Sequence, residues 1–495
     1  MASKSMEILD YIKGQNDYWL IGSDRFHFQQ LFEKLYLELL TYKTPQKILL
    51  AEREPVRFLA GFIAACAANC RVFLCNPDWG KQEWQEVFNL VQPNLILGDG
   101  DSGGWSKIVY VPLRGSEVAH GGDPQDRAGL PLPMPSSQLP IPNTIMIPTG
   151  GSSGKIKFAI HTWDTLMASV KGFTEYFQLN QVNSFCVLPL YHVSGLMQFM
   201  RSFTTGGKLA IFPFKQVESS PIYHLEPSEF FISLVPTQLQ RLLQNPDLTA
   251  WLSQFKTVLL GGAPAWNELL EKARFSRIRL APTYGMTETA SQIATVKPDD
   301  FLNGKISSGQ ILPHVQITIC NEKGDILKSN QKGNIIIKSQ SLALGYYPEI
   351  WKNQDYLQVD DLGFLDNDGH LNIVGRSSNK IITGGENVYP IEIESAIRAT
   401  QMVNDVCVIG IPDKQWGQAI TAIYIPKKAE ISSLEIQKIL KDKLCKFKIP
   451  KHWIPVSTLP RNTQGKINQQ QLQEIATNVL QMYFKSPPNN NTNSP

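Results

Sequence analysis

A loop rich in glycine and serine holds the first residues whose types and spacing could do chemistry. It lies in the segment MIPTGGSSGKIKFAIHT, residues 146–162, within and after the apolar run TIMI. Glycines let a backbone approach a ligand closely, and successive backbone N–H groups can hold phosphate oxygens. The side chains that could add hydroxyls or positive charge are Thr149, Ser152, Ser153, Lys155 and Lys157. Taken by itself, the loop fits either a phosphate site or an ordinary flexible surface loop.

The loop is not a Walker A motif. That motif needs a glycine at its first position and a serine or threonine after the Gly-Lys pair, whereas this chain has Thr149 and Ile156 there. A second glycine-rich match, GDGDSG at residues 98–103, is acidic and precedes the strand-like run KIVYVP. We therefore interpret it as a turn.

Four later segments carry side chains that suit the same ligand. The segment PTYGMTETASQI offers Tyr284, Thr287 and Glu288. A carboxylate beside a phosphate site is repelled unless a cation lies between them, so Glu288 indicates Mg²⁺. The segment VDDLGFLDNDGHLNIVGR offers Asp361, which can accept hydrogen bonds from ribose hydroxyls. The remaining two segments, GRSSNKIITGGENVYP and PRNTQGKINQQ, contribute Gly384, Gly385 and Lys466.

The elements that must position these residues have an α/β pattern. From Asn143 onward the apolar runs TIMIP, SFCVLPL, KLAIFPF, FFISLVP and TVLLGGAP alternate with helix-like segments, which predicts parallel α/β layers. The runs HVQITIC, GNIIIKS and HLNIVG predict a β-rich lobe at about 305–375. We expect a large N-terminal domain of layered α/β sheets, residues 1–376, and a small mobile α+β C-terminal domain, residues 377–485. A disordered tail, residues 486–495, would follow.

Composition excludes several classes of protein. The net charge of +3 is too balanced for a nucleic-acid-binding protein. The longest apolar run, 58–68, is too short to span a membrane, and the N-terminal residues lack the apolar core of a signal peptide. The 7 cysteines show no CxxC pair, and Cys66 and Cys70 fit buried small side chains. We expect a cytoplasmic protein.

Together, the motifs occur in the order found in the adenylate-forming superfamily of acyl- and aryl-CoA synthetases, luciferases and peptide-synthetase adenylation domains. The chain resembles this family over nearly its whole length. The resemblance implies that ATP converts a carboxylic acid to an acyl-AMP, with Mg²⁺, and that the thiol of CoA then displaces AMP. Attack of one anion on another needs cations along its path, which Mg²⁺ and Lys466 would supply.

The resemblance also implies roles for individual residues. Lys466 would contact the acyl oxygen and α-phosphate, Thr287 would bond the α-phosphate, and Glu288 would hold Mg²⁺. The remaining ATP-binding residues that it implies are Thr149, Ser152, Ser153, Gly154 and Lys157 for the phosphates, Gly262, Ala263 and Tyr284 for adenine, and Asp361 and Arg376 for ribose.

The chain departs from the family pattern at several positions. Ile156 replaces the usual loop proline, and Val359-Asp360 replaces the usual Thr-Gly before Asp361. Ser378 stands where the hinge residue of the family is Asp or Lys. We expect a hinge at residues 375–385, because one site cannot present both Lys466 and a thiol tunnel at the same time.

The last prediction concerns the identity of the carboxylic acid substrate. The segments YGMTETASQI and LPLYHVSGL most resemble the 2-succinylbenzoate–CoA ligases of the menaquinone and phylloquinone pathway. Ser291 and Gln292 could act as donors to the second carboxylate of that acid, and His192 could help if protonated. These three residues could also be purely structural. Gly384 and Gly385 are further candidate substrate-site residues. The alternatives are another aryl- or fatty-acyl-CoA ligase and a non-catalytic nucleotide-binding protein.

Overall fold

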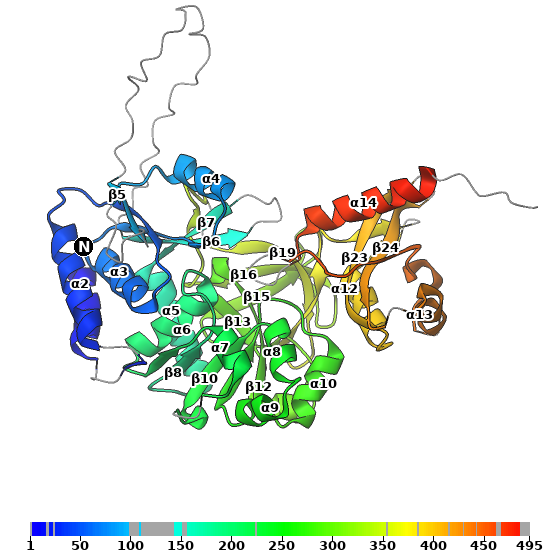
Figure 1. Ribbon diagram of the computed structural model, residues 1–495, viewed down its shortest axis with the longest axis horizontal. Helices are drawn as coiled ribbons and strands as arrows, with labels where there is room; N and C mark the ends of the chain where they lie inside the picture. The colour runs from blue at the N-terminus through cyan, green and yellow to red at the C-terminus, as the bar shows by residue number, and fades with distance from the viewer. Residues whose placement is uncertain are drawn as a thin grey trace, which may run out of the picture. The chain divides into compact units, whose positions relative to one another are not determined.

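A computed structural model describes most of the chain (Figure 1). The described residues are 2–15, 19–22, 25–98, 108–109, 143–150, 156–222, 225–352, 355–383, 386–413, 416–428, 430–441, 443–461 and 467–485. The predictions for Ser152, Ser153, Gly154, Gly384, Gly385, Lys466 and the tail 486–495 lie outside these residues. The chain forms two compact units. Unit 1 consists of Met1–Gln216, Gly285–Gln292 and Ser339–Asp355, and unit 2 consists of Val217–Tyr284, Ile293–Lys338 and Tyr356–Pro495.

The main sheet of unit 1 has a parallel centre and antiparallel margins. Its strand order is β18 (Glu349–Ile350), β17 (Gly345–Tyr346), β7 (Ile156–Thr162), β6 (Thr144–Gly150), β3 (Arg71–Leu74), β2 (Lys47–Ala51), β4 (Leu95–Gly98) and β5 (Ile108–Val109). The pairs among β6, β3, β2 and β4 are parallel. The β6–β7, β7–β17 and β4–β5 pairs are antiparallel.

Helices cover both faces of this sheet because its central strands are apolar on both sides. Along β2, Ile48 and Leu50 pack with helix α3 (Pro55–Ala67), whereas Leu49 packs with α4 (Lys81–Val91). Figure 1 shows α3 and α4 on opposite sides of β6 and β7. Glu54 begins α3 by accepting two backbone N–H groups, and proline at the first helical position fits the helix start.

A second group of elements in unit 1 carries three short parallel strands. Strand β9 (Leu209–Ile211) pairs with β1 (Leu20–Ile21) and with β8 (Asn183–Cys186). The helices of this group are α1 (Ala2–Lys13), α2 (Arg25–Leu40), α5 (Trp163–Phe177) and α6 (Val193–Thr204). Their apolar side chains, together with α3, form the largest core cluster of the protein.

Unit 2 begins with parallel strands and continues into an antiparallel lobe. The parallel strands are β10 (Phe230–Leu234), β11 (Thr257–Leu260) and β12 (Leu280–Met286), with helices α7 (Phe214–Ser219), α8 (Pro236–Leu242), α9 (Pro246–Leu252) and α10 (Asn267–Phe275) beside them in sequence. The lobe contains β13 (Ser291–Thr295), α11 (Pro298–Leu302), β14 (Gly309–Ile311), β15 (Val315–Cys320), β16 (Gly333–Ser339), β19 (Leu357–Leu365) and β20 (His370–Arg376). The β13–β14, β14–β20, β16–β19 and β19–β20 pairs are antiparallel, which confirms the β-rich character predicted for this region.

The C-terminal part of unit 2 has its own five-stranded sheet. Its members are β21 (Ile381–Thr383), β22 (Glu386–Val388), β23 (Val403–Asp413), β24 (Gly417–Pro426) and β25 (His452–Pro455), with α12 (Pro390–Arg398), α13 (Ser433–Leu440) and α14 (Gln469–Lys485). Val406 and Val408 pack in one core cluster, and Cys407 and Ile409 in another. This alternation gives the sheet a core on each face.

The predicted α/β class is confirmed, and two details differ from the expectation. Strand β7 pairs antiparallel with β6, because the five residues 151–155 between them are too few for the crossover that a parallel pair needs. Strand β17 pairs with β7, and β18 pairs with β17, so these two strands belong to the sheet of unit 1, although they fall within the range expected for the lobe. Cys66 and Cys70 are buried and free, as predicted. Among the described helices, none has the length and apolar character needed to cross a bilayer.

Candidate active site

The β6–β7 hairpin places the two described ends of the Gly/Ser loop opposite each other. Thr149 and Lys157 are register partners across the two strands. The Lys157 ammonium lies 5.4 Å from the centroid of the Tyr346 ring. A hydroxyl and an ammonium therefore flank residues 151–155, and phosphate binding by this loop stays a prediction.

The turn that carries Thr287 and Glu288 is held by backbone contacts within unit 1. His161 Nε2 lies 2.8 Å from the Thr287 carbonyl oxygen, and the N–H of Ala343 donates to the Glu288 carbonyl at 2.8 Å. Ala290 and Ser291 close the turn with φ values of 50° and 94°. Gly285 is required before the turn, because a Cβ there would lie 2.1 Å from the Ser291 carbonyl oxygen.

The carboxylate of Glu288 is oriented by a tyrosine that the sequence did not reveal. Tyr346 donates its hydroxyl to Glu288 Oε1 at 2.6 Å. Burial, and then the charge of Glu288, raise the pKa of Tyr346, so the phenol keeps its proton near pH 7. Glu288 thus presents an oxygen ligand of the kind that Mg²⁺ prefers, on a fixed turn and beside the threonine expected at the α-phosphate.

In unit 2 the three residues expected around the adenosine meet at one carboxylate. Tyr284 donates its hydroxyl to Asp361 Oδ2 at 2.7 Å, and Arg376 Nε donates to Asp361 Oδ1 at 3.0 Å. Asp361 and Arg376 are also register partners on β19 and β20. The structure therefore brings together residues that lie 77 and 15 positions apart in the sequence.

Gly262 and Ala263 lie in the loop that follows strand β11. They come after β11, which runs parallel to β12, and β12 carries Tyr284 near its carboxyl end. Since the carboxyl ends of parallel strands lie at one edge of a sheet, the adenine residues expected from the sequence share that edge. Gly262 has a φ of 82°, a left-handed conformation that glycine adopts without strain.

A buried arginine contacts the two residues expected to hold the acid. Arg201 on α6 donates to Ser291 Oγ at 3.2 Å and to Gln292 Oε1 at 3.3 Å. Its guanidinium carbon lies 4.1 Å from the centroid of the Phe173 ring. Only 3% of Arg201 is exposed, and its Nε has no hydrogen-bond partner among the described residues.

Burial lowers the pKa of Arg201 to about 9, and among the described residues no carboxylate forms an ion pair that would counteract this effect. The guanidinium is still protonated at pH 7. A buried cation of this kind favours an anionic ligand. Ser291 and Gln292 are the first residues of strand β13, and their role at the substrate stays a prediction. They accept hydrogen bonds from Arg201 rather than standing alone as donors.

His192 lies at the N-cap of α6, and its side chain makes no capping hydrogen bond. Its ring centroid is 4.5 Å from that of Tyr191. These contacts do not distinguish a substrate role from a structural one, so its substrate role stays a prediction.

Two departures from the family pattern contact each other. The backbone N–H of Ser378 donates to Asp360 Oδ1 at 3.0 Å, and the Ser378 hydroxyl donates to Asp360 Oδ2. The carboxylate thereby holds the turn that follows β20. The hinge at residues 375–385 itself stays a prediction.

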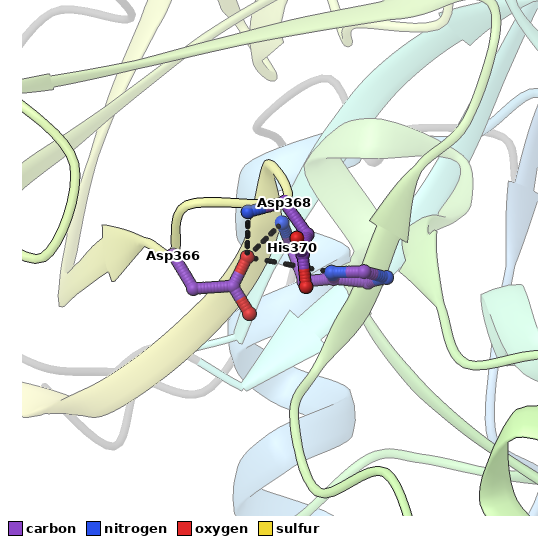
Figure 2. A group of neighbouring side chains, drawn as sticks. All are labelled: Asp366, Asp368 and His370. Carbon is purple, nitrogen blue, oxygen red and sulfur yellow. Dashed lines mark hydrogen bonds and ion pairs between the residues drawn. The ribbon is translucent and has the colours of Figure 1, made fainter.

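A cluster outside these contacts resembles a metal site but has another explanation. Figure 2 shows Asp366 and Asp368, which lie in the turn between β19 and β20, beside His370, the first residue of β20. One ligand atom from each of the three residues lies within 4.8 Å of the others. Asp366 Oδ1 accepts the backbone N–H groups of Asp368 and His370, which is ordinary turn geometry. Lys305 Nζ lies 3.4 Å from Asp366 and 3.1 Å from Asp368, so a cation already pairs with both carboxylates.

Comparison with protein families gives two matches along the chain. Residues 36–347 match the family described as AMP-binding enzyme, and residues 392–466 match the AMP-binding enzyme C-terminal domain.

The relatives include proteins named 2-succinylbenzoate–CoA ligase. That of Bacillus thuringiensis subsp. konkukian is 32% identical over 466 residues, which are 92% of this chain and 94% of the relative. That of Enterococcus faecalis is 33% identical over 295 residues, 58% of this chain and 60% of the relative. The chain aligns with only about half of the ligase of Oceanobacillus iheyensis, 50% of its length, at 34% identity.

Solved structures share the fold. The o-succinylbenzoate CoA synthetase (MenE) of Bacillus subtilis, in complex with the acyl-adenylate intermediate OSB-AMP, has a TM-score of 0.77 at 24% identity, covering 94% of this chain and 97% of that one. ATP-bound MatB of Rhodopseudomonas palustris has a TM-score of 0.78 at 21% identity, covering 96% and 99%.

Proposed function

Because the chain belongs to the AMP-binding enzyme family, we propose that it is an ATP-dependent acid–CoA ligase whose acid is 2-succinylbenzoate. In the first step the acid carboxylate attacks the α-phosphorus of ATP, which forms the acyl-adenylate and releases pyrophosphate. In the second step the CoA thiol attacks the acyl carbon, which forms the thioester and releases AMP. The product, 2-succinylbenzoyl-CoA, belongs to menaquinone and phylloquinone biosynthesis.

Each unit, taken by itself, contains residues that suit the first step. Tyr284, Asp361 and Arg376 form a network that can accept ribose hydroxyls and fix the nucleoside. Thr287 and Glu288 lie on a turn held by backbone hydrogen bonds.

Mg²⁺ bound at Glu288 supplies positive charge where the carboxylate approaches the phosphate. Lys157 adds charge at the loop expected to bind the phosphates, and we assign Lys466 to the acyl oxygen and α-phosphate. These charges would favour the transition state, because they would oppose the negative charge that develops as pyrophosphate leaves.

The single observation that carries the choice of acid is the buried Arg201. 2-Succinylbenzoate has two carboxylates, of which only the succinyl one is activated. The carboxylate on the ring remains charged and must be paired when it leaves water. Arg201 is a buried cation that contacts Ser291 and Gln292, and relatives named 2-succinylbenzoate–CoA ligase match over most of the chain. We assign the ring carboxylate to this arginine.

The proposal also names CoA as the thiol substrate and the cytoplasm as the location of the protein. The 7 free cysteines are consistent with a reducing compartment. The near-neutral charge balance gives no support to a nucleic-acid partner.

The proposal is tested by the two half-reactions on the purified chain. Exchange of labelled pyrophosphate into ATP should require 2-succinylbenzoate and Mg²⁺, and addition of CoA should give the thioester by mass spectrometry. Glu288→Gln should lower the exchange and raise the Mg²⁺ requirement, whereas Glu430→Gln, an exposed control, should change neither. Exchange with no acid at all would contradict the proposal. Exchange with another aryl or fatty acid alone would leave only the general ligase function.

A further inference from the structure

His161 lies at the end of β7 and is fully buried. Its two ring nitrogens have different partners. Nδ1 lies 3.0 Å from the Thr165 hydroxyl on α5, and Nε2 lies 2.8 Å from the Thr287 carbonyl oxygen. The ring therefore links the strand that follows the Gly/Ser loop to the turn that carries Thr287 and Glu288.

The hydrogen-bond pattern fixes the tautomer of this ring. Burial lowers the pKa of His161 to about 4, so the ring is neutral near pH 7 and carries one N–H. A carbonyl oxygen can only accept, so the proton must be on Nε2. Nδ1 is then an acceptor for a hydrogen bond from the Thr165 hydroxyl, which also lies 3.0 Å from the Thr162 carbonyl oxygen. Thr165 Oγ1 in turn accepts the backbone N–H of Thr162 at 3.0 Å.

The hydrogen bond between His161 and Thr287 stabilises a turn whose conformation the local sequence alone does not favour. The turn ends with two non-glycine residues at positive φ, Ala290 and Ser291, a conformation that costs free energy unless the surroundings impose it. The Ser169 hydroxyl donates to the Ala290 carbonyl at 2.7 Å, and His161 holds the other end through Thr287. The direction of the Thr287 hydroxyl and the Glu288 carboxylate thus depends on buried side chains of β7 and α5.

We propose that His161 is a positioning residue for adenylation, which acts by donating Nε2–H to the carbonyl of Thr287. This inference rests on the proposed function, because it assigns a partner to residues that the proposal places at the α-phosphate and the metal. His161 does not contact the reacting atoms. It fixes the turn, so its loss should affect the adenylation step and the Mg²⁺ requirement more than thioester formation.

Two substitutions separate this role from a general effect on packing. His161→Gln places an amide N–H near the position of Nε2 and can still donate to Thr287. His161→Asn is shorter, reaches only the position of Nδ1, and leaves the Thr287 carbonyl without its donor. Ser184→Ala is the matched control in unit 1, since it also removes a buried hydrogen bond from a side chain to a carbonyl, that of Gln198 at 3.1 Å.

The readouts are the rate of pyrophosphate exchange, the Mg²⁺ concentration for half-maximal exchange, thioester formation from supplied acyl-adenylate, and the melting temperature. Removing a hydrogen-bond partner behind a metal ligand costs about 10- to 100-fold in affinity or activity, so His161→Asn should lose at least about tenfold in exchange. His161→Gln should stay within about threefold of the wild type, and thioester formation should stay within about threefold for both.

Equal exchange rates for the Asn and Gln variants would overturn the inference. So would a loss in Ser184→Ala as large as that in His161→Asn at the same melting temperature. If His161→Asn does not fold, Thr165→Val, which removes the donor to Nδ1, should lower exchange while Thr165→Ser preserves it; equal rates for these two would also overturn it. Absence of exchange in the wild type would instead reject the proposed function.

Discussion

Replacing Arg201 by methionine should change stability and activity in opposite directions. Methionine has a similar length but no charge, and it can pack against Phe173. In the folded protein the guanidinium is buried, has two neutral acceptors, and has no carboxylate partner among the described residues. The protein therefore bears the cost of burying this charge for a reason other than stability.

The size of that cost follows from the pKa of Arg201. Lowering it from 12.5 to about 9 corresponds to about 5 kcal/mol. Because Arg201 is protonated in both the folded and the unfolded protein at pH 7, the whole cost is present there, and it diminishes only as the pH rises above about 9. Loss of two hydrogen bonds offsets about 2 kcal/mol of the gain. Arg201→Met should leave the free energy of unfolding unchanged or raise it by up to about 3 kcal/mol.

The effect on activity should be large and selective for one carboxylate. Removing one partner of a buried charged pair costs about 2–5 kcal/mol, so kcat/KM for 2-succinylbenzoate should fall by about 30-fold to about 4,000-fold. The analogue 4-oxo-4-phenylbutanoate has the same skeleton without the ring carboxylate. Its kcat/KM should change by less than about threefold, because it never pairs with the arginine.

The assay compares pyrophosphate release for the two acids in the wild type and Arg201→Met, together with urea unfolding of both proteins at pH 7. Arg201→Lys is the matched control: it keeps the charge, and it should recover part of the activity toward 2-succinylbenzoate. An equal loss of kcat/KM for both acids would refute the assignment of the ring carboxylate to Arg201. A fall in unfolding free energy of more than about 2 kcal/mol would refute the reasoning on stability.

Three further predictions concern the nucleotide, the metal and the adenylation step. Asp361→Asn weakens the acceptor that Tyr284 and Arg376 share, so the apparent KM for ATP should rise about tenfold, while the KM for the acid should stay within about threefold in initial-rate measurements. Tyr346→Phe removes the donor to Glu288 and should raise the Mg²⁺ concentration for half-maximal exchange about tenfold; an unchanged Mg²⁺ titration would contradict it. Lys466→Ala should lower adenylation at least about 10²-fold but spare thioester formation from supplied acyl-adenylate; equal losses would remove Lys466 from the first step.

Strands were the part of the fold that sequence patterns predicted best. The run TIMIP is strand β6 and TVLLGGAP contains β11, because short apolar runs bounded by turn residues favour buried strands. The pairing of β17 with β7 could not be predicted. Tyr346 and its partner Ala159 are far apart in the chain, and a two-residue strand carries no periodicity.

The site residues that belong to a single sequence motif could be predicted. The residues that join the site only through contacts with a distant segment could not. Asp361 and Arg376 belong to one hairpin, and their pairing follows from its register. Arg201 sits in a helix whose neighbours Met197, Phe199 and Met200 are fully buried, and a lone arginine in such a segment is normally a solvated charge. His161 was an isolated histidine in the sequence, because its partner Thr287 lies 126 positions away.

The central claim is the identity of the acid, and the specificity of the wild-type enzyme tests it most directly. The measurement is kcat/KM for pyrophosphate release, with ATP, Mg²⁺ and CoA present, for 2-succinylbenzoate, 4-oxo-4-phenylbutanoate, benzoate, coumarate and a medium-chain fatty acid. A site with a buried cation should reject acids that leave it unpaired, so 2-succinylbenzoate should exceed every other acid by at least about 10²-fold. An equal or higher kcat/KM for any acid without the second carboxylate would contradict the account.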